Sequence, residues 1–230
     1  MSSFASKGRF SIESDFTGAA IDPGWVGTTE NSGTAAIVVA KDGGVVNLVT
    51  GTSSGNRSAL TSGLNVKSEN GSLIFEAIVM NLTAVTNRAT FIGLTDTVSI
   101  EMPIELSGVT LTSSATDAVG FVYDTAATTG VVYIQGVNTD VDTALKAAAL
   151  PSTGAAFTPA AGTYDEYRIE VNTDGYASFY INGDYVGGVS SAVSPSVLLT
   201  PIVIVEARTT AAQTVYVDQC GVEAARERTP

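Results

Sequence analysis

Apolar and polar residues alternate along much of this chain, a pattern that indicates β-strands with one buried and one exposed face. The alternation is clearest over Tyr167–Val171 and again over Ala177–Ile181. Each run is followed by a turn dipeptide, Asp174-Gly175 and Asn182-Gly183, which supplies the positive-φ residues that tight hairpins need. The segment therefore predicts three antiparallel strands, the third beginning at Tyr185.

Apolar runs elsewhere predict further strands. Ser72–Leu82 carries a single charge, Glu76, so we expect an inner strand with Glu76 on its wetter face. The run Thr200–Arg208 predicts a strand that is covered on both faces, and Thr214–Ala224 predicts the last strand. Two more apolar runs flank the sequence KDGG at residues 41–44, which predicts another hairpin.

One segment, Asp140–Pro151, has the pattern of a helix. Asp140 or Asp142 can cap its beginning, strong helix formers fill its middle, and a proline follows its end. We expect a short helix over Asp142–Leu150 that connects strands across an edge or end of the sheets.

Strand patterns recur at short spacing, and no linker or fixed-period repeat interrupts them. The sequence therefore predicts one domain over residues 1–224, with a frayed tail at 225–230. The predicted fold class is all-β: a two-sheet antiparallel β-sandwich with one short helix. Hydrophobic residues make up 44% of the chain, which is enough to fill such a core.

The net charge of −12, from 11 Lys and Arg against 23 Asp and Glu, restricts the partners. An acidic surface repels phosphate backbones and anionic lipid, so we expect neither nucleic acid nor a membrane as partner. No run approaches the ~20 apolar residues that span a bilayer. The first 16 residues also lack a signal-peptide core, so we expect a protein made in the cytoplasm and not exported.

The chain has no histidine and one cysteine, Cys220, which removes several kinds of chemistry. Ser-His-Asp and Cys-His nucleophile systems need histidine, as do the common zinc and copper sites. A single cysteine forms no intramolecular disulfide and no thiolate cluster. We therefore predict no cofactor, and we expect Cys220 to be a buried, unreactive thiol.

The C-terminal hairpins lie in YDEYRIEVNTDGYASFYINGDYVG, which begins at Tyr164 and resembles the concanavalin A-like (laminin-G-like) jelly-roll superfamily. The segment DFTGAAIDPGW, Asp15–Trp25, is similar to the opening strand and tryptophan of that superfamily. VYVDQCGV, residues 215–222, is similar to its returning last strand. The resemblance implies a jelly roll whose first and last strands meet in one sheet.

Three segments in the middle of the chain resemble a group of bacteriophage virion proteins that carry this sandwich. They are FIGLTD at residues 91–96, TDAVGFVYD at 116–124 and GVNTDVD at 136–142. The group includes decoration, head-fibre and tail-associated proteins. The resemblance implies a non-enzymatic structural protein, most simply a capsid decoration protein on the head surface. The protein would be located in the virion, where it would dock on the major capsid protein or another virion protein. It would also form a homo-oligomer.

The superfamily also contains glycoside hydrolases, whose chemistry needs a pair of carboxylates. Those enzymes carry Glu-x-Asp-x-x-Glu on a central strand, where alternate positions share one face. The nearest match, Glu13-Ser14-Asp15, lacks the final glutamate, because Gly18 stands there, and it lies in the opening strand. Glu101 and Glu105 lie four residues apart in an expected loop. We therefore predict no catalytic residue, and a glycoside hydrolase is the least favoured function.

The superfamily contains calcium-assisted lectins too. A hard cation needs several converging oxygens, and the weak candidates are Asp117 with Asp124, or Asp140 with Asp142. Neither pair has the dense spacing of a calcium loop, so no metal site is predicted.

Aromatic residues offer an alternative function, a lectin-like carbohydrate-binding module for attachment to surface glycans of a host. Sugar rings stack on exposed Trp and Tyr, and the candidates are Trp25, Tyr176, Tyr180 and Tyr185. Tyr176 and Tyr180 share a strand face, opposite to Phe179. Cross-strand packing is the competing explanation for these tyrosines, as is closure of the end of the sandwich for Trp25.

Overall fold

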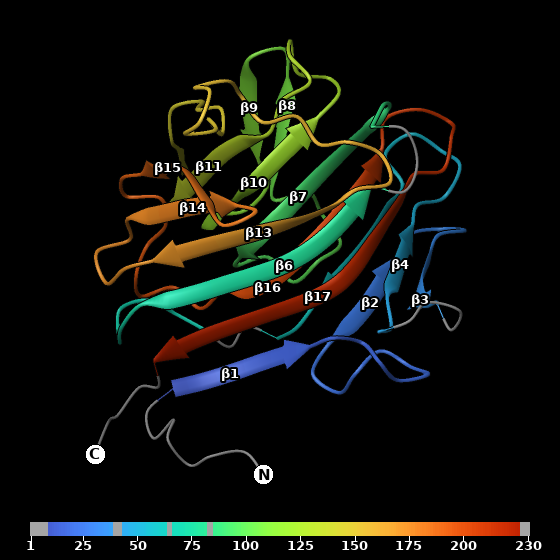
Figure 1. The fold of residues 1–230 in the computed structure, drawn as a ribbon, viewed down its shortest axis with the longest axis horizontal. Coiled ribbons are helices and arrows are strands. Elements are labelled where there is room, and N and C mark those ends of the chain that lie inside the picture. The colour runs from blue at the N-terminus through green and yellow to red at the C-terminus, as the bar shows by residue number, and fades with distance from the viewer. Residues whose placement is uncertain (1–8, 39–42, 64–65, 82–84, 226–230) are drawn as a thin grey trace.

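Two large antiparallel sheets lie face to face in the molecule (Figure 1). The computed structural model describes residues 9–38, 43–63, 66–81 and 85–225. Within these ranges the chain forms seventeen strands and no helix. The all-β, two-sheet sandwich predicted from the sequence is therefore confirmed.

Sheet A contains the C-terminal hairpins. Its strands, in spatial order, are β15 (Asp184–Val189), β14 (Ala177–Ile181), β13 (Tyr164–Val171), β6 (Leu73–Asn81), β17 (Thr214–Ala225), β4 (Val46–Val49) and β3 (Thr34–Ile37). β1 (Arg9–Ser14) pairs with the second half of β17, from Arg9 opposite Ala225 to Ser14 opposite Cys220. The first and last strands thus meet in one sheet, as the resemblance implied.

Sheet B forms the second layer. Its strands, in spatial order, are β12 (Val141–Asp142), β11 (Tyr133–Asn138), β10 (Ala118–Asp124), β7 (Arg88–Thr95), β16 (Thr200–Ala207), β5 (Arg57–Thr61) and β2 (Val26–Thr29). A separate hairpin, β8 (Ile104–Ser107) and β9 (Thr110–Ser113), lies outside this sheet.

The main core lies between the inner faces of the two sheets. Alternate residues of each strand point into it, and the ring of Phe121 from sheet B lies 5.1 Å from Tyr167 and 5.2 Å from Phe179 of sheet A. Each side chain of this size contributes about 1.5–3 kcal/mol when buried. Cys220 also lies fully buried in this core, and burial raises the pKa of its thiol, which agrees with the predicted unreactive cysteine.

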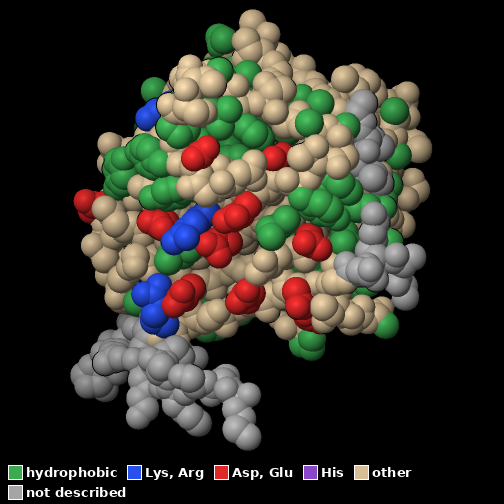
Figure 2. Space-filling view, in the orientation of Figure 1, with side chains coloured by type: hydrophobic (Ala, Val, Ile, Leu, Met, Phe, Trp, Pro, Cys, Tyr) green, Lys and Arg blue, Asp and Glu red, His purple; other side chains and the backbone are tan. Residues whose placement is uncertain are grey.

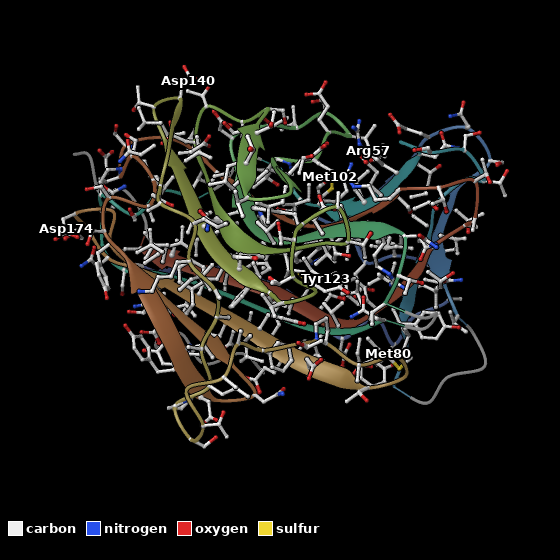
Figure 3. All side chains as sticks on the ribbon, turned by 90° about the horizontal axis from the view of Figure 1, so that it is seen from above. Arg57, Met80, Met102, Tyr123, Asp140 and Asp174 are labelled. Carbon is white, nitrogen blue, oxygen red and sulfur yellow. The ribbon has the colours of Figure 1, made fainter. Side chains whose placement is uncertain are left out.

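A second core lies on the outer side of sheet B, beneath the β8–β9 hairpin. Met102, Ile104 and Leu106 pack there with Phe91 and Ile204 of sheet B. Figure 3 shows Met102 on this outer side, whereas Tyr123 lies between the layers. All eight residues of β16 are buried, so the prediction of a strand covered on both faces is confirmed.

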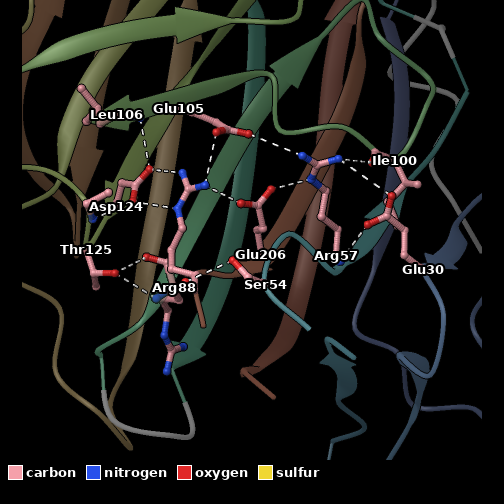
Figure 4. Close-up of polar contacts among 12 residues, drawn as sticks. Glu30, Ser54, Arg57, Arg88, Ile100, Glu105, Leu106, Asp124, Thr125 and Glu206 are labelled. Carbon is pink, nitrogen blue, oxygen red and sulfur yellow. Dashed lines mark hydrogen bonds and ion pairs between the residues drawn. The ribbon is translucent and has the colours of Figure 1, made fainter. Parts of the chain in front are cut away.

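An ionic cluster fastens this hairpin to sheet B (Figure 4). Arg208 contacts Asp124 at the end of β10, Glu105 of β8 at 3.2 Å, and Glu206 of β16. Arg57 of β5 donates to Glu206 at 2.6 Å and lies 3.5 Å from Glu105. Burial raises the pKa of Glu206, and the guanidinium groups of Arg208 and Arg57 offset part of this rise.

The predicted hairpins of sheet A are confirmed. β13, β14 and β15 pair in the expected order, and Gly175 has φ +80°. Asn182 and Gly183 have φ +53° and +82°, the pair of left-handed residues that a two-residue hairpin turn requires. The earlier predicted hairpin joins β3 to β4, although residues 39–42 of its turn lie outside the described residues. β17 ends at Ala225, and the rest of the predicted tail also lies outside them.

The predicted helix over Asp142–Leu150 is wrong. The segment runs extended beside β11, where the Ile134 amide donates to the Lys146 carbonyl at 2.8 Å and Ala148 donates to Val132 at 2.9 Å. A helix of nine residues is marginal by itself, and these cross-strand hydrogen bonds satisfy the backbone instead. The described residues contain no helix long and apolar enough to cross a membrane.

The aspartate expected to cap that helix has a different role. Thr139 and Asp140 have φ +52° and +62°, so they form the turn between β11 and β12. The Asp140 amide donates to the Thr116 carbonyl at 2.9 Å, which holds the turn against the beginning of β10.

Candidate functional site

The outer face of sheet A is the part of the sandwich that presents polar side chains in an ordered array. The β8–β9 hairpin covers the outer face of sheet B, whereas alternate residues of β6 and β13 are only half-buried. In Figure 2, carboxylate and guanidinium groups gather across the middle of this face of the molecule. The outer face of sheet A is therefore the candidate site.

Strand register places six residues in one line across this face, here called the central row. The row crosses β15, β14, β13, β6, β17 and β1 and consists of Tyr185, Tyr180, Arg168, Glu76, Gly221 and Glu13. Directly opposed residues of neighbouring strands point to the same side of a sheet. The row thus brings side chains together that are up to 172 positions apart in the sequence.

Arg168 lies near the centre of the row between two carboxylates. Its guanidinium lies 3.3 Å from Glu76 of β6 and 2.5 Å from Glu170 of β13. It also lies 5.9 Å from the ring centre of Tyr180, within the range of a cation–π contact. The guanidinium thereby links the charged part of the central row to its aromatic part.

A depression of about 180 Å³ lies beside Gly221. Its lining residues are Ser11, Glu13, Ile74, Glu76, Arg168, Gln219, Gly221, Val222 and Glu223. Gly221 leaves a gap between Glu76 and Glu13, because a Cβ atom there would lie 3.3 Å from the Cγ of Glu13. The missing side chain thus opens the depression between two carboxylates.

Hydrogen bonds and ion pairs orient the groups around this depression. The Gln219 amide donates to the Glu13 carboxylate at 2.7 Å, which fixes two of the lining side chains relative to each other. Arg9 of β1 contacts Glu223 of β17 on the same face. The site therefore offers oriented donors and acceptors to a polar ligand.

Three tyrosines form the aromatic end of the site. The rings of Tyr180 and Tyr185 pack edge to face with centres 5.6 Å apart, and the hydroxyls of Tyr176 and Tyr185 lie 3.4 Å apart. Gly188 makes room for this arrangement, since a Cβ there would lie 1.9 Å from the Tyr176 hydroxyl. Tyr185 is 47% exposed, so one of these rings is available to a ligand.

The Tyr185 hydroxyl is a neutral donor and acceptor. The hydrogen bond with Tyr176, together with partial burial, raises the pKa of Tyr185 to about 12. A neutral phenol can both give and accept a hydrogen bond, as a sugar hydroxyl does.

Trp25, the fourth aromatic candidate, lies apart from this cluster. Its side chain is 5% exposed and packs edge to face on Phe16, with ring centres 6.1 Å apart. Trp25 therefore belongs to the core and presents no ring face to a ligand.

The carboxylates of the sequence motif Glu13-Ser14-Asp15 are separated by the fold. Glu13 joins the central row, whereas the Ser14 hydroxyl points inward and donates to Asp22. Asp15 is exposed beyond the end of β1. Burial is the main cause of the raised pKa of Asp218, and the charge of Asp15 adds to it.

The other sequence candidates also lie outside the central row. Glu105 belongs to the ionic cluster and Glu101 is exposed in the loop before β8. Asp117 precedes β10 and Asp124 ends it, so seven residues of extended chain, about 23 Å, separate the two weak cation candidates. In the described part of the chain no group of three or more His, Cys, Asp or Glu residues is placed to hold a metal ion.

The strands and their register define a concanavalin A-like jelly roll, the fold that the sequence resemblance implied. No protein-family model matches the sequence, and no curated protein matches it. Solved structures match it through the fold, however.

Three of these structures illustrate the likeness. The β-glucanase of Bacillus licheniformis has a TM-score of 0.63 at 11% identity, over 94% of this chain and 98% of that one. The cellulose-induced protein Cip1 has a TM-score of 0.61 at 17% identity, over 95% and 100%. The carbohydrate recognition domain of Emp47p has a TM-score of 0.60 at 8% identity, over 94% and 95%. At these identities the likeness shows the fold alone. The resemblance to phage virion proteins gains no support from these structures and stays a prediction.

Proposed function

We propose that this protein binds a saccharide on the outer face of sheet A and does not cleave it. The observation that carries this proposal is the central row, which places two tyrosine rings, a guanidinium and two carboxylates in one line beside a depression. Saccharide-binding and saccharide-cleaving proteins of the same fold support it as analogy.

The groups in the row match the two sides of a sugar ring. Carboxylates and amides accept hydrogen bonds from sugar hydroxyls, and a guanidinium donates to them. The apolar face of a sugar can lie against Tyr185, which is exposed at the end of the row. Because ion pairs and a hydrogen bond already hold Arg168, Glu76 and Glu13, less side-chain freedom is lost when a ligand binds.

Glu76 and Glu13, the two carboxylates of the central row, lack the spacing of a retaining glycosidase. The neighbours of Glu76 on the outer face of β6 are Ile74 and Ile78, so this strand offers no second carboxylate two positions away. Glu13 is two strands from Glu76, about 9.6 Å between backbones, whereas retaining chemistry places its carboxyl groups ~5 Å apart. Inverting enzymes place theirs ~6.5–9.5 Å apart, and the experiment therefore measures cleavage directly.

A glycan array followed by calorimetry tests the proposal. We expect binding that Glu76→Gln weakens at least severalfold, since the variant loses the charge that orients Arg168. Asp140→Asn is the matched control, because it makes the same change in a turn of sheet B. We expect no new reducing ends after incubation with the bound saccharide. Absence of binding across the array would reject the proposal, and release of reducing ends would show an enzyme.

The predicted virion role is a separate question. Docking on a capsid protein, homo-oligomer formation and location in the particle stay predictions from the sequence resemblance. Mass spectrometry of fractionated particles tests them, and a saccharide-binding face on a particle would fit host attachment.

A further inference from the structure

We propose that the depression on sheet A selects its saccharide by charge, taking uncharged or amino sugars and rejecting uronic acids and sulfated sugars. This inference rests on the proposed function and names the class of ligand for the same site.

The lining side chains carry more negative than positive charge. Three of them are carboxylates, Glu13, Glu76 and Glu223, and one is a guanidinium, Arg168. A ligand carboxylate or sulfate in the depression would therefore face three like charges.

Two guanidinium groups on this face are already engaged by protein carboxylates. Arg168 lies between Glu76 and Glu170, and Arg9 contacts Glu223. An anionic ligand would have to displace a protein carboxylate to reach either guanidinium. Glu13, by contrast, accepts from the neutral amide of Gln219, so its charge is not offset by that contact.

The expected size of the selection follows from Coulomb's law. Two unit charges about 7 Å apart in water interact by about one RT, which changes an affinity about threefold. Three like charges lining the depression, offset in part by Arg168, therefore disfavour an anionic sugar by on the order of tenfold. High salt weakens the effect, because charges at this distance are close to the Debye length.

The test uses β-1,4-linked hexaoses of glucose, glucosamine and glucuronic acid, together with an array of uncharged, amino, uronic and sulfated oligosaccharides. We expect binding among the uncharged and amino members, and at least tenfold weaker binding of the uronic and sulfated members at low salt. The double variant Glu13→Gln with Glu223→Gln should shift the affinity ratio toward anionic members about tenfold. The control Asp140→Asn with Asp142→Asn removes the same charge from sheet B and should leave the ratio unchanged.

The outcomes separate the two proposals. If no member of any class binds, the proposed function fails. If uronic or sulfated members bind as tightly as uncharged ones, or if the double variant and its control behave alike, the function stands and the selection by charge is overturned.

Discussion

Arg208 contacts both carboxylate oxygens of Asp124, with its Nε 3.1 Å from Oδ1 and a terminal nitrogen bonded to Oδ2. Asp124 is fully buried at the end of β10, and the same carboxylate accepts the Leu106 amide of β8 at 3.1 Å. The buried ion pair links the ends of β10 and β16, and Asp124 and Arg208 also hold the β8–β9 hairpin through Leu106 and Glu105. Nearby, Arg208 also contacts Glu206, whose side chain is 3% exposed.

Arg208→Ala should destabilise the protein by about 3–5 kcal/mol, because it leaves the buried carboxylates of Asp124 and Glu206 without this partner. Arg168→Ala is the control, since that residue and Glu170 are each 37% exposed and such pairs contribute about 0–1 kcal/mol. Urea unfolding measures both variants. Equal urea midpoints for the two variants would contradict the prediction that the buried Arg208–Asp124 pair contributes more to stability than the exposed Arg168–Glu170 pair.

Asp165 gives a prediction about pH. Its side chain is 4% exposed, its Oδ1 accepts from Asn182 at 3.0 Å, and its Oδ2 has no hydrogen-bond partner among the described residues. Burial raises the pKa of Asp165, and the hydrogen bond from Asn182 offsets part of the rise. The native state therefore favours the protonated carboxyl, and ionisation destabilises the fold.

The sign of the effect follows from linkage. A raised pKa in the native state means that the contribution of Asp165 to stability falls as the pH rises above 3.8, its ordinary value. Asp165→Asn should therefore be more stable than wild type at pH 7, and the difference should shrink as the pH falls toward 3.8. Denaturant unfolding between pH 3 and pH 8 measures this, and a difference that grows on acidification would refute it.

Much of the fold followed from short-range patterns. The turns at Asp174-Gly175 and Asn182-Gly183 have conformations that their residues favour, so the three strands around them were predictable. The segment Asp142–Leu150 was not, because alanine-rich helix propensity is weak compared with the backbone hydrogen bonds that β11 offers. No local sequence pattern reveals that the unpaired side of β11 lies next to this segment.

The candidate site was predictable only at its aromatic end. Tyr180 and Tyr185 lie on one hairpin, so alternation and turn position place them together. Glu76 and Glu13 meet across Gly221 through pairing of strands that are far apart in sequence. One sequence does not encode that register in a readable pattern. The alternation did place Glu76 on the wetter face, which the structure confirms.

Gly93 and Gly120 face each other across β7 and β10, and this close approach gives a third prediction. A Cβ at Gly93 would lie 2.2 Å from the Val119 carbonyl oxygen, a backbone atom that cannot move aside. Gly93→Ala should cost about 3 kcal/mol or prevent folding, as overpacking does. Gly130→Ala, whose Cβ would meet only the Tyr123 hydroxyl at 3.9 Å, should change stability by less than about 0.5 kcal/mol. Thermal unfolding compares them, and similar melting temperatures would contradict the packing argument.

The final prediction separates ligand stacking from cross-strand packing at the tyrosines. Tyr185→Ala removes the exposed ring and should weaken binding of the array-selected saccharide about 2–10-fold, the size of one stacking contact. Tyr185→Phe keeps the ring and loses only the contact with the Tyr176 hydroxyl, so it should bind nearly as wild type does. Leu198→Ala, equally exposed at 47%, controls for loss of apolar surface. Calorimetry measures affinity and urea unfolding measures stability for each variant. If Tyr185→Ala loses stability but keeps its affinity while Glu76→Gln loses affinity, the tyrosines only pack the sheet and the ligand lies at the carboxylate end of the central row.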